Sequence, residues 1–406
     1  MLIALMLLLY AAGNVFLICR GLRWIRRLGL SWHRIAAGVF AGLVILAAAL
    51  PVLGALANPD RAAGALQRAG NLWLGFCLYL FLALLPLEIA GRLRRRGRPA
   101  ARGRHSAFSF WGGIAVLVIA AAGVSYGIFH AGQMRTTSYT VVVPSESAAE
   151  ERDSLRIVFT ADLHMGSQIG CPEIKKMVDR INAADPDVVL LGGDLFDSGY
   201  DLLDDPAQLE EILRGIRSCE GVYAVYGNHD VSETLIGGFS VTPLNRAFRD
   251  PRMTEFLENA HIRMLEDQAV ALDGGKVWLA GRLDGEKAGD GTNNRLSAAA
   301  LMKKTKSGTP VIVLEHEPVE LQQLSDLGAS LILSGHTHDG QLFPLNLAQK
   351  LIWDNPYGRR QYGQAASIVT SGVGLYGPPM RVMTDSEVVV INLQFYLLNR
   401  GMAVGG

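Results

Sequence analysis

Five short clusters of polar residues each follow directly after an apolar, strand-like run. They are Asp162-Leu163-His164, Gly193-Asp194-Leu195-Phe196-Asp197, Gly227-Asn228-His229-Asp230, Glu315-His316-Glu317-Pro318 and Gly335-His336-Thr337-His338. In an open α/β sheet, the carboxyl ends of the strands form the ligand crevice. We therefore expect the five clusters to meet at one place.

The histidines concentrate in these clusters. The chain has nine His, and five of the six that follow residue 132 lie in the clusters, with only His261 outside. A single histidine is most often an ordinary surface or core residue, but five beside two Asp and one Asn indicate a site. Imidazole, carboxylate and amide groups without a thiolate suit divalent ions such as Mn²⁺, Fe²⁺ or Zn²⁺.

The number of candidate ligands favours two ions over one. The seven candidates are Asp162, His164, Asp194, Asn228, His316, His336 and His338. They are too many for one ion and suit two ions that share a carboxylate. Two ions roughly 3.5–4 Å apart form the clamp that assists in-line displacement at phosphorus.

The order D-x-H, G-D-x-x-D, G-N-H-D, a lone H and G-H-x-H resembles the calcineurin-like metallophosphoesterases, over residues 138 to 395. Gly340-Gln341 after His338, together with the membrane segments described below, resembles the bacterial membrane-associated branch of that family. The resemblance implies an α/β/β/α sandwich with two sheets. It also implies two divalent ions and hydrolysis of a phosphoric ester.

The resemblance also assigns roles to individual residues. Asp162, His164 and His338 would bind the first metal, Asn228, His316 and His336 the second, and Asp194 would bridge both. His229 would stabilise the transition state or protonate the leaving oxygen, Asp230 would orient its imidazole, and Asp197 would hold a ligand by a hydrogen bond. Arg381, in a late loop, would contact either substrate phosphate or a structural ion-pair partner.

These residues predict a metal-dependent phosphodiesterase or phosphatase in which a metal-bridging hydroxide attacks phosphorus. A phosphodiester is the preferred substrate over a phosphomonoester or pyrophosphate. A lipid-linked or envelope-derived substrate is expected from the location alone. The alternative is a non-catalytic membrane sensor that binds a phosphorylated ligand, against which His229 argues, because a pure binder needs no acid for a leaving group.

The elements around the clusters predict an α/β domain over residues 151–400. A βαβαβ order in its first half favours a parallel sheet, and the strand-rich second half is expected to form another. Helices are expected at Pro172–Asn182 and Pro206–Ser218. Strands are expected at 155–161, 188–191, 222–226, 276–280, 311–314, 331–333, 367–370 and 388–393. Residues 133–150 are expected to be a linker with a short strand at Tyr139–Val143.

The N-terminal third predicts a membrane domain at residues 1–132. Half of the whole chain is hydrophobic (50%) and only 19% is charged, against about a quarter in soluble proteins, so a single soluble domain is disfavoured. Four apolar runs, about 2–19, 35–57, 70–91 and 107–129, approach the ~20 residues that span a bilayer as a helix. A cleaved signal peptide is disfavoured for the first run because no Lys or Arg precedes it.

The arginines predict the orientation. Residues 1–132 hold fourteen Arg, no Lys and two acids, Asp60 and Glu88, and twelve of the Arg follow the first and third runs. Basic loops stay cytoplasmic, so both termini and the catalytic domain are expected outside the bacterial inner membrane. A transporter is disfavoured because no paired charges are evident within the spans. We expect the bilayer and a phosphoester as partners and no nucleic acid; the oligomeric state stays open.

Overall fold

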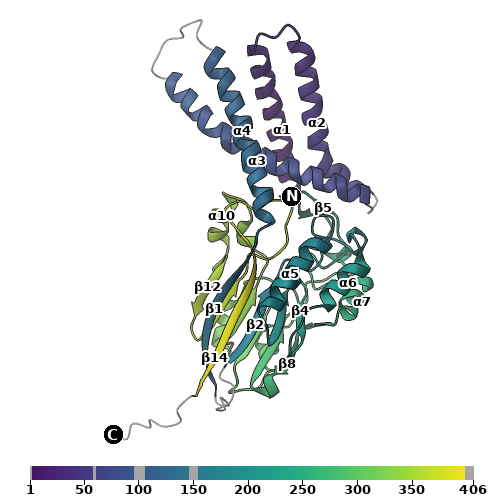
Figure 1. Ribbon diagram of the computed structural model, residues 1–406, viewed down its shortest axis with the longest axis vertical. Helices are drawn as coiled ribbons and strands as arrows, with labels where there is room; N and C mark the ends of the chain where they lie inside the picture. The colour runs from purple at the N-terminus through teal and green to yellow at the C-terminus, as the bar shows by residue number, and fades with distance from the viewer. Residues whose placement is uncertain (1, 58–60, 96–105, 146–153, 398–406) are drawn as a thin grey trace, which may run out of the picture. The chain divides into compact units, whose positions relative to one another are not determined.

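The computed structural model describes residues 2–57, 61–95, 106–145 and 154–397 (Figure 1). The chain divides into two compact units. The first unit contains residues 1–129 together with two short segments, 235–241 and 377–380. The second unit contains residues 130–234, 242–376 and 381–406.

The first unit is built on four long apolar helices. They are α1 (Leu2–Arg27), α2 (His33–Leu56), α3 (Arg61–Arg95) and α4 (Ser106–Ala131). Each is long and apolar enough to cross a membrane. All four extend beyond at least one end of the expected apolar runs. The arginines at 96, 98, 102 and 104, which contribute to the orientation argument, lie outside the described residues.

One ion pair joins two of these helices. Arg20 of α1 pairs with Glu88 of α3. Arg20 lies just after the first expected apolar run (2–19), and Glu88 lies near the end of the third (70–91). The pair therefore joins the ends of two expected spans and does not contradict the expectation that paired charges are absent from their middle.

The second unit contains two six-stranded sheets. The first has the order β1-β14-β2-β3-β4-β7, and its strands are β1 (Met134–Ser145), β14 (Ser386–Leu397), β2 (Ser154–Thr160), β3 (Val188–Gly192), β4 (Val222–Val225) and β7 (Ile262–Met264). The second has the order β12-β13-β11-β10-β9-β8, and its strands are β12 (Gly358–Tyr362), β13 (Ala365–Val369), β11 (Leu331–Ser334), β10 (Val311–Leu314), β9 (Val277–Gly281) and β8 (Gln268–Leu272). Strands β2, β3, β4 and β7 are mutually parallel, as are β9, β10, β11 and β13.

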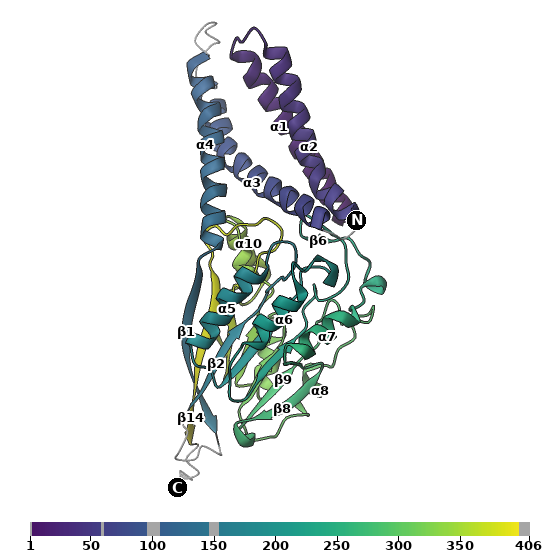
Figure 2. The same ribbon diagram turned by 45° about the vertical axis from the view of Figure 1, so that its right-hand side comes forward.

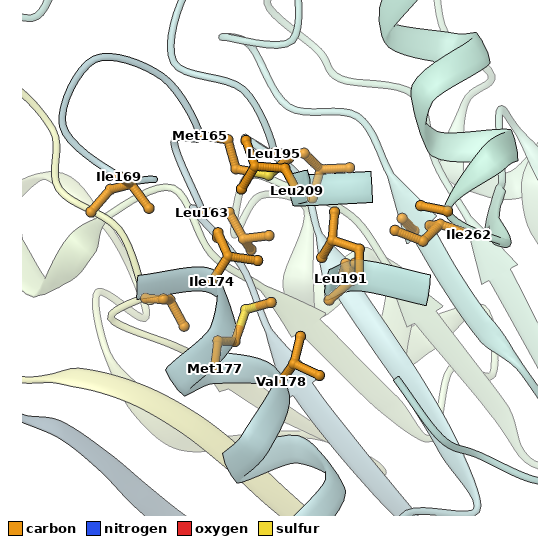
Figure 3. Packing of buried hydrophobic residues seen from close by; sticks show 14 of the residues in the cluster. Leu163, Met165, Ile169, Ile174, Met177, Val178, Leu191, Leu195, Leu209 and Ile262 are labelled. Carbon is orange, nitrogen blue, oxygen red and sulfur yellow. The ribbon is translucent and has the colours of Figure 1, made fainter. Parts of the chain in front are cut away.

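Helices cover the outer faces of both sheets, which gives the expected α/β/β/α layers (Figure 2). Helices α5 (Cys171–Ala183), α6 (Pro206–Arg214) and α7 (Pro251–Asn259) pack on the first sheet, where Ile174 and Leu209 join a buried cluster with Leu191 (Figure 3). Helices α8 (Ala298–Met302) and α9 (Leu321–Asp326) pack on the second sheet. A third apolar cluster, including Ile157 and Ile312, fills the space between the sheets.

Local sequence signals explain where the helices begin and end. Asp205 caps α6 by accepting a hydrogen bond from the backbone N–H of Gln208, and Pro206 occupies the first turn. Helix α6 ends at Arg214, four residues before the expected end, and Gly215 is its C-terminal cap.

The prediction that residues 133–150 form a linker is wrong for most of this segment. Residues 134–145 form strand β1, which pairs in parallel with β14 over its whole length, from Met134–Ser386 to Ser145–Leu397. The short strand expected at Tyr139–Val143 is the middle of this longer one. The partner strand lies about 250 positions away, so no local pattern revealed the pairing. Residues 146–153, and the expected domain end at 398–400, lie outside the described residues.

Candidate metal centre

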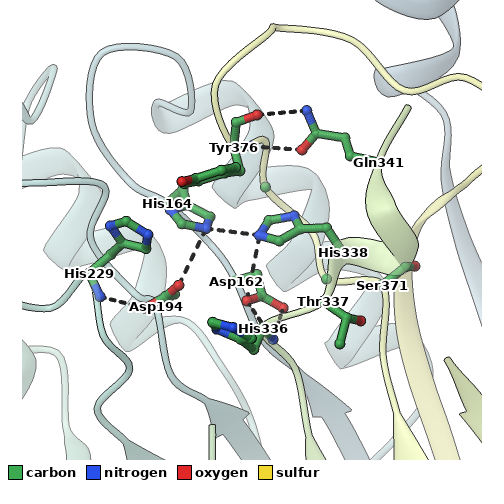
Figure 4. A network of polar contacts seen from close by, with 12 residues as sticks. Asp162, His164, Asp194, His229, His336, Thr337, His338, Gln341, Ser371 and Tyr376 are labelled. Atoms are coloured by element: carbon green, nitrogen blue, oxygen red, sulfur yellow. Dashed lines mark hydrogen bonds and ion pairs between the residues drawn. The ribbon is translucent and has the colours of Figure 1, made fainter. Parts of the chain in front are cut away.

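The five clusters meet at the carboxyl ends of five strands, as expected. Asp162 and His164 follow β2, Asp194 follows β3, and Asn228 and His229 follow β4 of the first sheet. From the second sheet, His316 follows β10, and His336 and His338 follow β11. Both sheets therefore contribute ligands to one buried centre (Figure 4).

Three of the predicted residues form the first group of metal donors. One ligand atom each of Asp162, His164 and His338 lies within 4.8 Å of the others. The two Nε2 atoms of the histidines are 3.0 Å apart, and Nε2 of His338 is 3.6 Å from Oδ1 of Asp162. These are the three residues assigned to the first metal.

A second group lies beside the first. Ligand atoms of Asp194, His316 and His336 fall within the same 4.8 Å limit. The side-chain oxygen of Asn228 is 3.2 Å from Nε2 of His316 and 3.1 Å from Nδ1 of His336. Asn228 therefore completes the four-residue set assigned to the second metal.

Asp194 lies between the two groups. Its Oδ2 is 3.1 Å from Nε2 of His316 and 3.7 Å from Nε2 of His164. Its Oδ1 accepts a hydrogen bond of 2.8 Å from the backbone N–H of His229. One carboxylate thus faces donors of both groups, which is the position that a bridging ligand requires.

Five of the seven candidate ligands have left-handed backbone conformations. Their φ angles are +53° at Asp162, +46° at His164, +50° at Asp194, +69° at His336 and +50° at His338. Such conformations are uncommon for residues other than glycine and cluster at functional sites. The strand ends therefore turn sharply, so that the side chains face one another.

The donors fit divalent ions. The histidines His164 and His338 face each other through Nε2, while Nδ1 of each is buried without a hydrogen-bond partner in the described part of the chain. Burial and the nearby His316 lower the pKa of His336 to about 3. Burial also lowers the pKa of His338 well below its usual range. Neutral imidazoles are the form that binds metal.

The carboxylate of Asp194 is held in its charged form. Burial alone would raise its pKa, but the imidazoles of His316 and His229 bring that pKa well below the usual range. Asp162 behaves differently, because burial raises its pKa to about 6 despite the opposing effect of His316. A divalent ion beside both would favour the charged form of each carboxylate.

His229 lies beside the donors and is held by a partner that the sequence analysis missed. Its Nδ1 is 2.5 Å from Oε1 of Glu233, and Oε2 of Glu233 is 2.5 Å from Nζ of Lys287. The expectation that Asp230 orients this imidazole is wrong. The carboxylate of Asp230 instead accepts hydrogen bonds from the backbone N–H groups of Gly227 and Phe196, so it holds the loop.

Two further expected positions differ in detail. Oδ1 of Asp197 is 3.6 Å from Nδ1 of His164, which is close enough for an ion pair but too long for the expected hydrogen bond. Arg381 is fully buried and donates to the backbone carbonyls of Ser371, Gly372 and Gly374. It therefore stabilises the late loop through backbone carbonyls, in place of the structural ion pair that was one of its two expected roles.

The same loop places Tyr376 over the centre, which the sequence did not suggest. Its ring centroid lies 5.3 Å from that of His229, 5.9 Å from His164 and 6.0 Å from His338. The side chain of Gln341 clamps the backbone of Tyr376 by two hydrogen bonds of 2.8 Å, one to its N–H and one to its carbonyl (Figure 4). Tyr376 is therefore a fixed wall of the site.

Comparison with known proteins agrees with this geometry. Residues 155–340 match the family described as calcineurin-like phosphoesterase. A "Transmembrane protein with metallophosphoesterase domain" from Danio rerio is 32% identical over 342 residues, which cover 78% of this chain and 72% of the relative. Its counterpart from Bos taurus is 32% identical over 297 residues, covering 69% and 62%.

Bacterial relatives are similar as well. An "Uncharacterized metallophosphoesterase" from Helicobacter pylori is 29% identical over 241 residues, covering 59% of this chain and 60% of the relative. The chain thus spans about three fifths to three quarters of the length of these relatives. Since the relatives include animal and bacterial proteins, the comparisons do not single out the bacterial branch.

Two sheets that bring seven candidate donors together, with a histidine beside them, define a metallophosphoesterase fold and site. The chain belongs to the calcineurin-like phosphoesterase family. Membership supports phosphoester hydrolysis with divalent ions, and the four apolar helices support association with a membrane.

Proposed function

We propose that this protein is a membrane-bound phosphodiesterase with a dinuclear metal centre. The observation that carries the proposal is the position of Asp194 between two donor groups, with the first at His164 and the second at His316. Two divalent ions held there would neutralise charge on the phosphate and activate the attacking water.

The residues around the ions divide the remaining work. Glu233 holds Nδ1 of His229, which leaves Nε2 of that imidazole to donate a proton to the departing oxygen. Burial lowers the pKa of His229, but the carboxylates of Asp194 and Glu233 more than offset this and raise it to about 9. Glu233, which belongs to neither group of metal donors, therefore favours the protonated imidazole that a general acid requires.

Two cationic side chains near the metal centre are already bound by other groups of the protein, and this favours a diester substrate over a monoester. Lys287 is bound by Glu233, and Arg381 is bound by backbone carbonyls. A monoester dianion carries one more charge than a diester and is most often recognised by additional Arg or Lys groups. With both of these cations already occupied, the singly charged diester is the better match.

A substrate comparison tests this proposal. The full chain, purified in detergent and loaded with Mn²⁺, Fe²⁺ or Zn²⁺, is assayed with bis(4-nitrophenyl) phosphate and 4-nitrophenyl phosphate. We expect a higher kcat/KM for the diester. Turnover of the monoester far above that of the diester would refute the diester assignment.

The sensor alternative is tested by His229. The variant His229→Ala should retain both ions, because His229 belongs to neither group of candidate metal donors. Its turnover should fall by about 10²–10⁴-fold. If the wild-type protein holds two ions and hydrolyses no phosphoester, the sensor is the better explanation.

The proposed orientation places the catalytic unit outside the cytoplasm of a bacterial cell. It rests on the Arg-rich segments after the first and third apolar runs. Cys219 is free and exposed, so it reports the side on which the unit lies. A membrane-impermeant maleimide added to intact spheroplasts should label the wild type and leave Cys219→Ser at background. Labelling of Cys219 only after lysis would reverse the orientation.

A further inference from the structure

Helix α10 (Leu345–Ile352) turns its apolar side chains away from the domain. The exposed fractions are 48% at Leu345, 51% at Leu347, 89% at Leu351 and 68% at Ile352. The half-buried side chains on the helix are instead the polar Asn346 and Gln349, whose carbonyl oxygens are shielded from solvent.

This polarity is the reverse of that found on a helix facing water. A surface helix of a globular protein buries its apolar stripe and exposes its polar one. Contiguous exposed apolar side chains mark an interaction site for a protein or a membrane. Lys350, also exposed, adds a basic group of the kind that interfacial helices direct toward lipid head groups.

Backbone contacts and two ion pairs link the segment before α10 to the last turn of α4. Just before α10, Leu342 bridges to Val382, and the N–H of Phe343 donates to the carbonyl of Val382. Met383, the next residue, is 66% exposed. Two residues later, Asp385 forms ion pairs with His130 and with Arg135.

His130 belongs to the last turn of α4, and Arg135 to the start of β1. Only Gly132 and Gln133 separate α4 from β1, a span of about 10 Å at ~3.5 Å per residue. The beginning of β1 is therefore close to the point where the chain leaves the bilayer. Both ribbon views place α10 at the end of the domain where β1 begins (Figures 1 and 2).

The same helix borders the metal centre. The loop that carries His338 leads directly into it, and Trp353 follows its last residue. The ring of Trp353 meets the ring of His336 edge-on, with centroids 5.2 Å apart. A molecule held against α10 thus lies next to one of the donors of the second group.

We propose that α10 is an interfacial helix that inserts Leu345, Leu347, Leu351 and Ile352 into the bilayer surface, and that the metal centre takes its phosphoester from a membrane lipid. The lipid assignment rests on the proposed phosphoesterase function, whereas the insertion of α10 does not. The bilayer is the chosen occupant because the exposed face lies at the end of the domain tethered to a membrane span.

Insertion is tested without any activity. The full chain carries Cys19→Ser and Cys219→Ser together with Leu351→Cys, labelled with bimane and reconstituted into vesicles. A matched control carries Ser307→Cys, an exposed site before the amino end of β10. Lipids with a nitroxide near the head group should quench the label at 351 severalfold more than the label at 307.

Equal quenching at the two positions would overturn the insertion. Disulfide cross-linking of two Leu351→Cys chains, without quenching by the lipid, would assign the face to a second copy of the chain and would also overturn it.

Substrate delivery is tested by the double variant Leu351→Glu/Ile352→Glu. Leu327→Glu is the matched control, because Leu327 is an exposed leucine before the amino end of β11. On phosphatidylglycerol and phosphatidylethanolamine vesicles, the double variant should lose about tenfold or more in turnover, since charge opposes interfacial binding. On bis(4-nitrophenyl) phosphate in detergent, the turnover of the double variant should stay within about twofold of that of the wild type. The turnover of Leu327→Glu should stay within about twofold of the wild type on both the lipid vesicles and bis(4-nitrophenyl) phosphate.

Equal losses on the two substrates, or no loss on lipid, would overturn the delivery role. If the wild type cleaves bis(4-nitrophenyl) phosphate but none of the lipids, the lipid assignment fails and the phosphoesterase stands. If it cleaves neither, the proposed function fails, and the quenching result still decides the insertion.

Discussion

Nδ1 of His229 and Oε1 of Glu233 lie 2.5 Å apart at the edge of the metal centre, and the two residues are four positions apart in the sequence. Both side chains are buried, and Lys287 approaches the second oxygen of Glu233. The ion pair fixes the imidazole and stabilises its charged form. Glu233 is therefore a positioning residue for the group that we assign as the acid.

We predict that the loss of turnover in Glu233→Gln depends on the leaving group of the substrate. An aryl diester with a 4-nitrophenolate leaving group needs little protonation, so its turnover should fall only a few-fold. A diester with an alkyl leaving group should lose about 10²-fold, within the range for general acid catalysis. Steady-state kinetics on the two diesters measures this, with metal content as the control. Equal losses on both would assign Glu233 a merely structural role.

The same variant should change the pH profile. Removing the charge of Glu233 lowers the pKa of His229, because the carboxylate stabilises the imidazolium. Activity that needs protonated His229 is present below its pKa and is lost as pH rises through it. The alkaline limb of kcat/KM for the alkyl diester should therefore move to lower pH in Glu233→Gln. An unmoved limb would mean that another group controls it.

We predict that Asp194→Asn reduces bound metal from two ions per chain to one or fewer. The amide lacks the negative charge of the carboxylate, whose Oδ2 faces both His164 and His316. Elemental analysis after removal of free metal measures the stoichiometry. Asp179→Asn, at an exposed site of α5, is the control and should keep both ions. Retention of two ions by Asp194→Asn would refute the bridge.

The close packing of glycine against the donors gives another prediction. A Cβ at Gly227 would overlap Oδ1 and the backbone nitrogen of Asp194, whereas a Cβ at Gly199 would meet nothing within 4 Å. Gly227→Ala should displace the carboxylate, weaken metal binding and cost about 1–3 kcal/mol in the free energy of unfolding. Gly199→Ala should do neither. Calorimetric titration with Mn²⁺ and denaturant unfolding compare the two, and identical behaviour would contradict the argument.

The sequence predicted the convergence of the candidate ligands because each of them is marked by a local pattern. Each donor follows an apolar run, and the end of a buried strand places a polar side chain at a sheet edge whatever the distant chain does. The parallel order of β2, β3 and β4 followed from the alternation of strands with helices. The fold and the meeting of the seven candidate ligands at one place were therefore predictable without coordinates.

The partners of His229 were not accessible in this way. Adjacency favoured Asp230, but the turn after β4 directs that carboxylate to backbone N–H groups. Lys287 lies 54 positions from Glu233, so only the folded chain brings them together. The contacts of Arg381 were not predictable for a similar reason. An arginine in a loop near a phosphate site can instead donate hydrogen bonds to buried backbone carbonyls, as Arg381 does.

The clamp on Tyr376 can be tested through Gln341. Gln341→Leu removes both hydrogen bonds to the backbone of Tyr376, and each unsatisfied buried group costs about 1–3 kcal/mol. The ring should then leave its position 5.3 Å from His229, so that KM rises while both ions stay bound. Gln361→Leu, at an exposed residue of β12, is the matched control. Thermal unfolding and steady-state kinetics measure the two effects. A lower melting temperature with unchanged KM would show that the wall formed by Tyr376 does not contact the substrate.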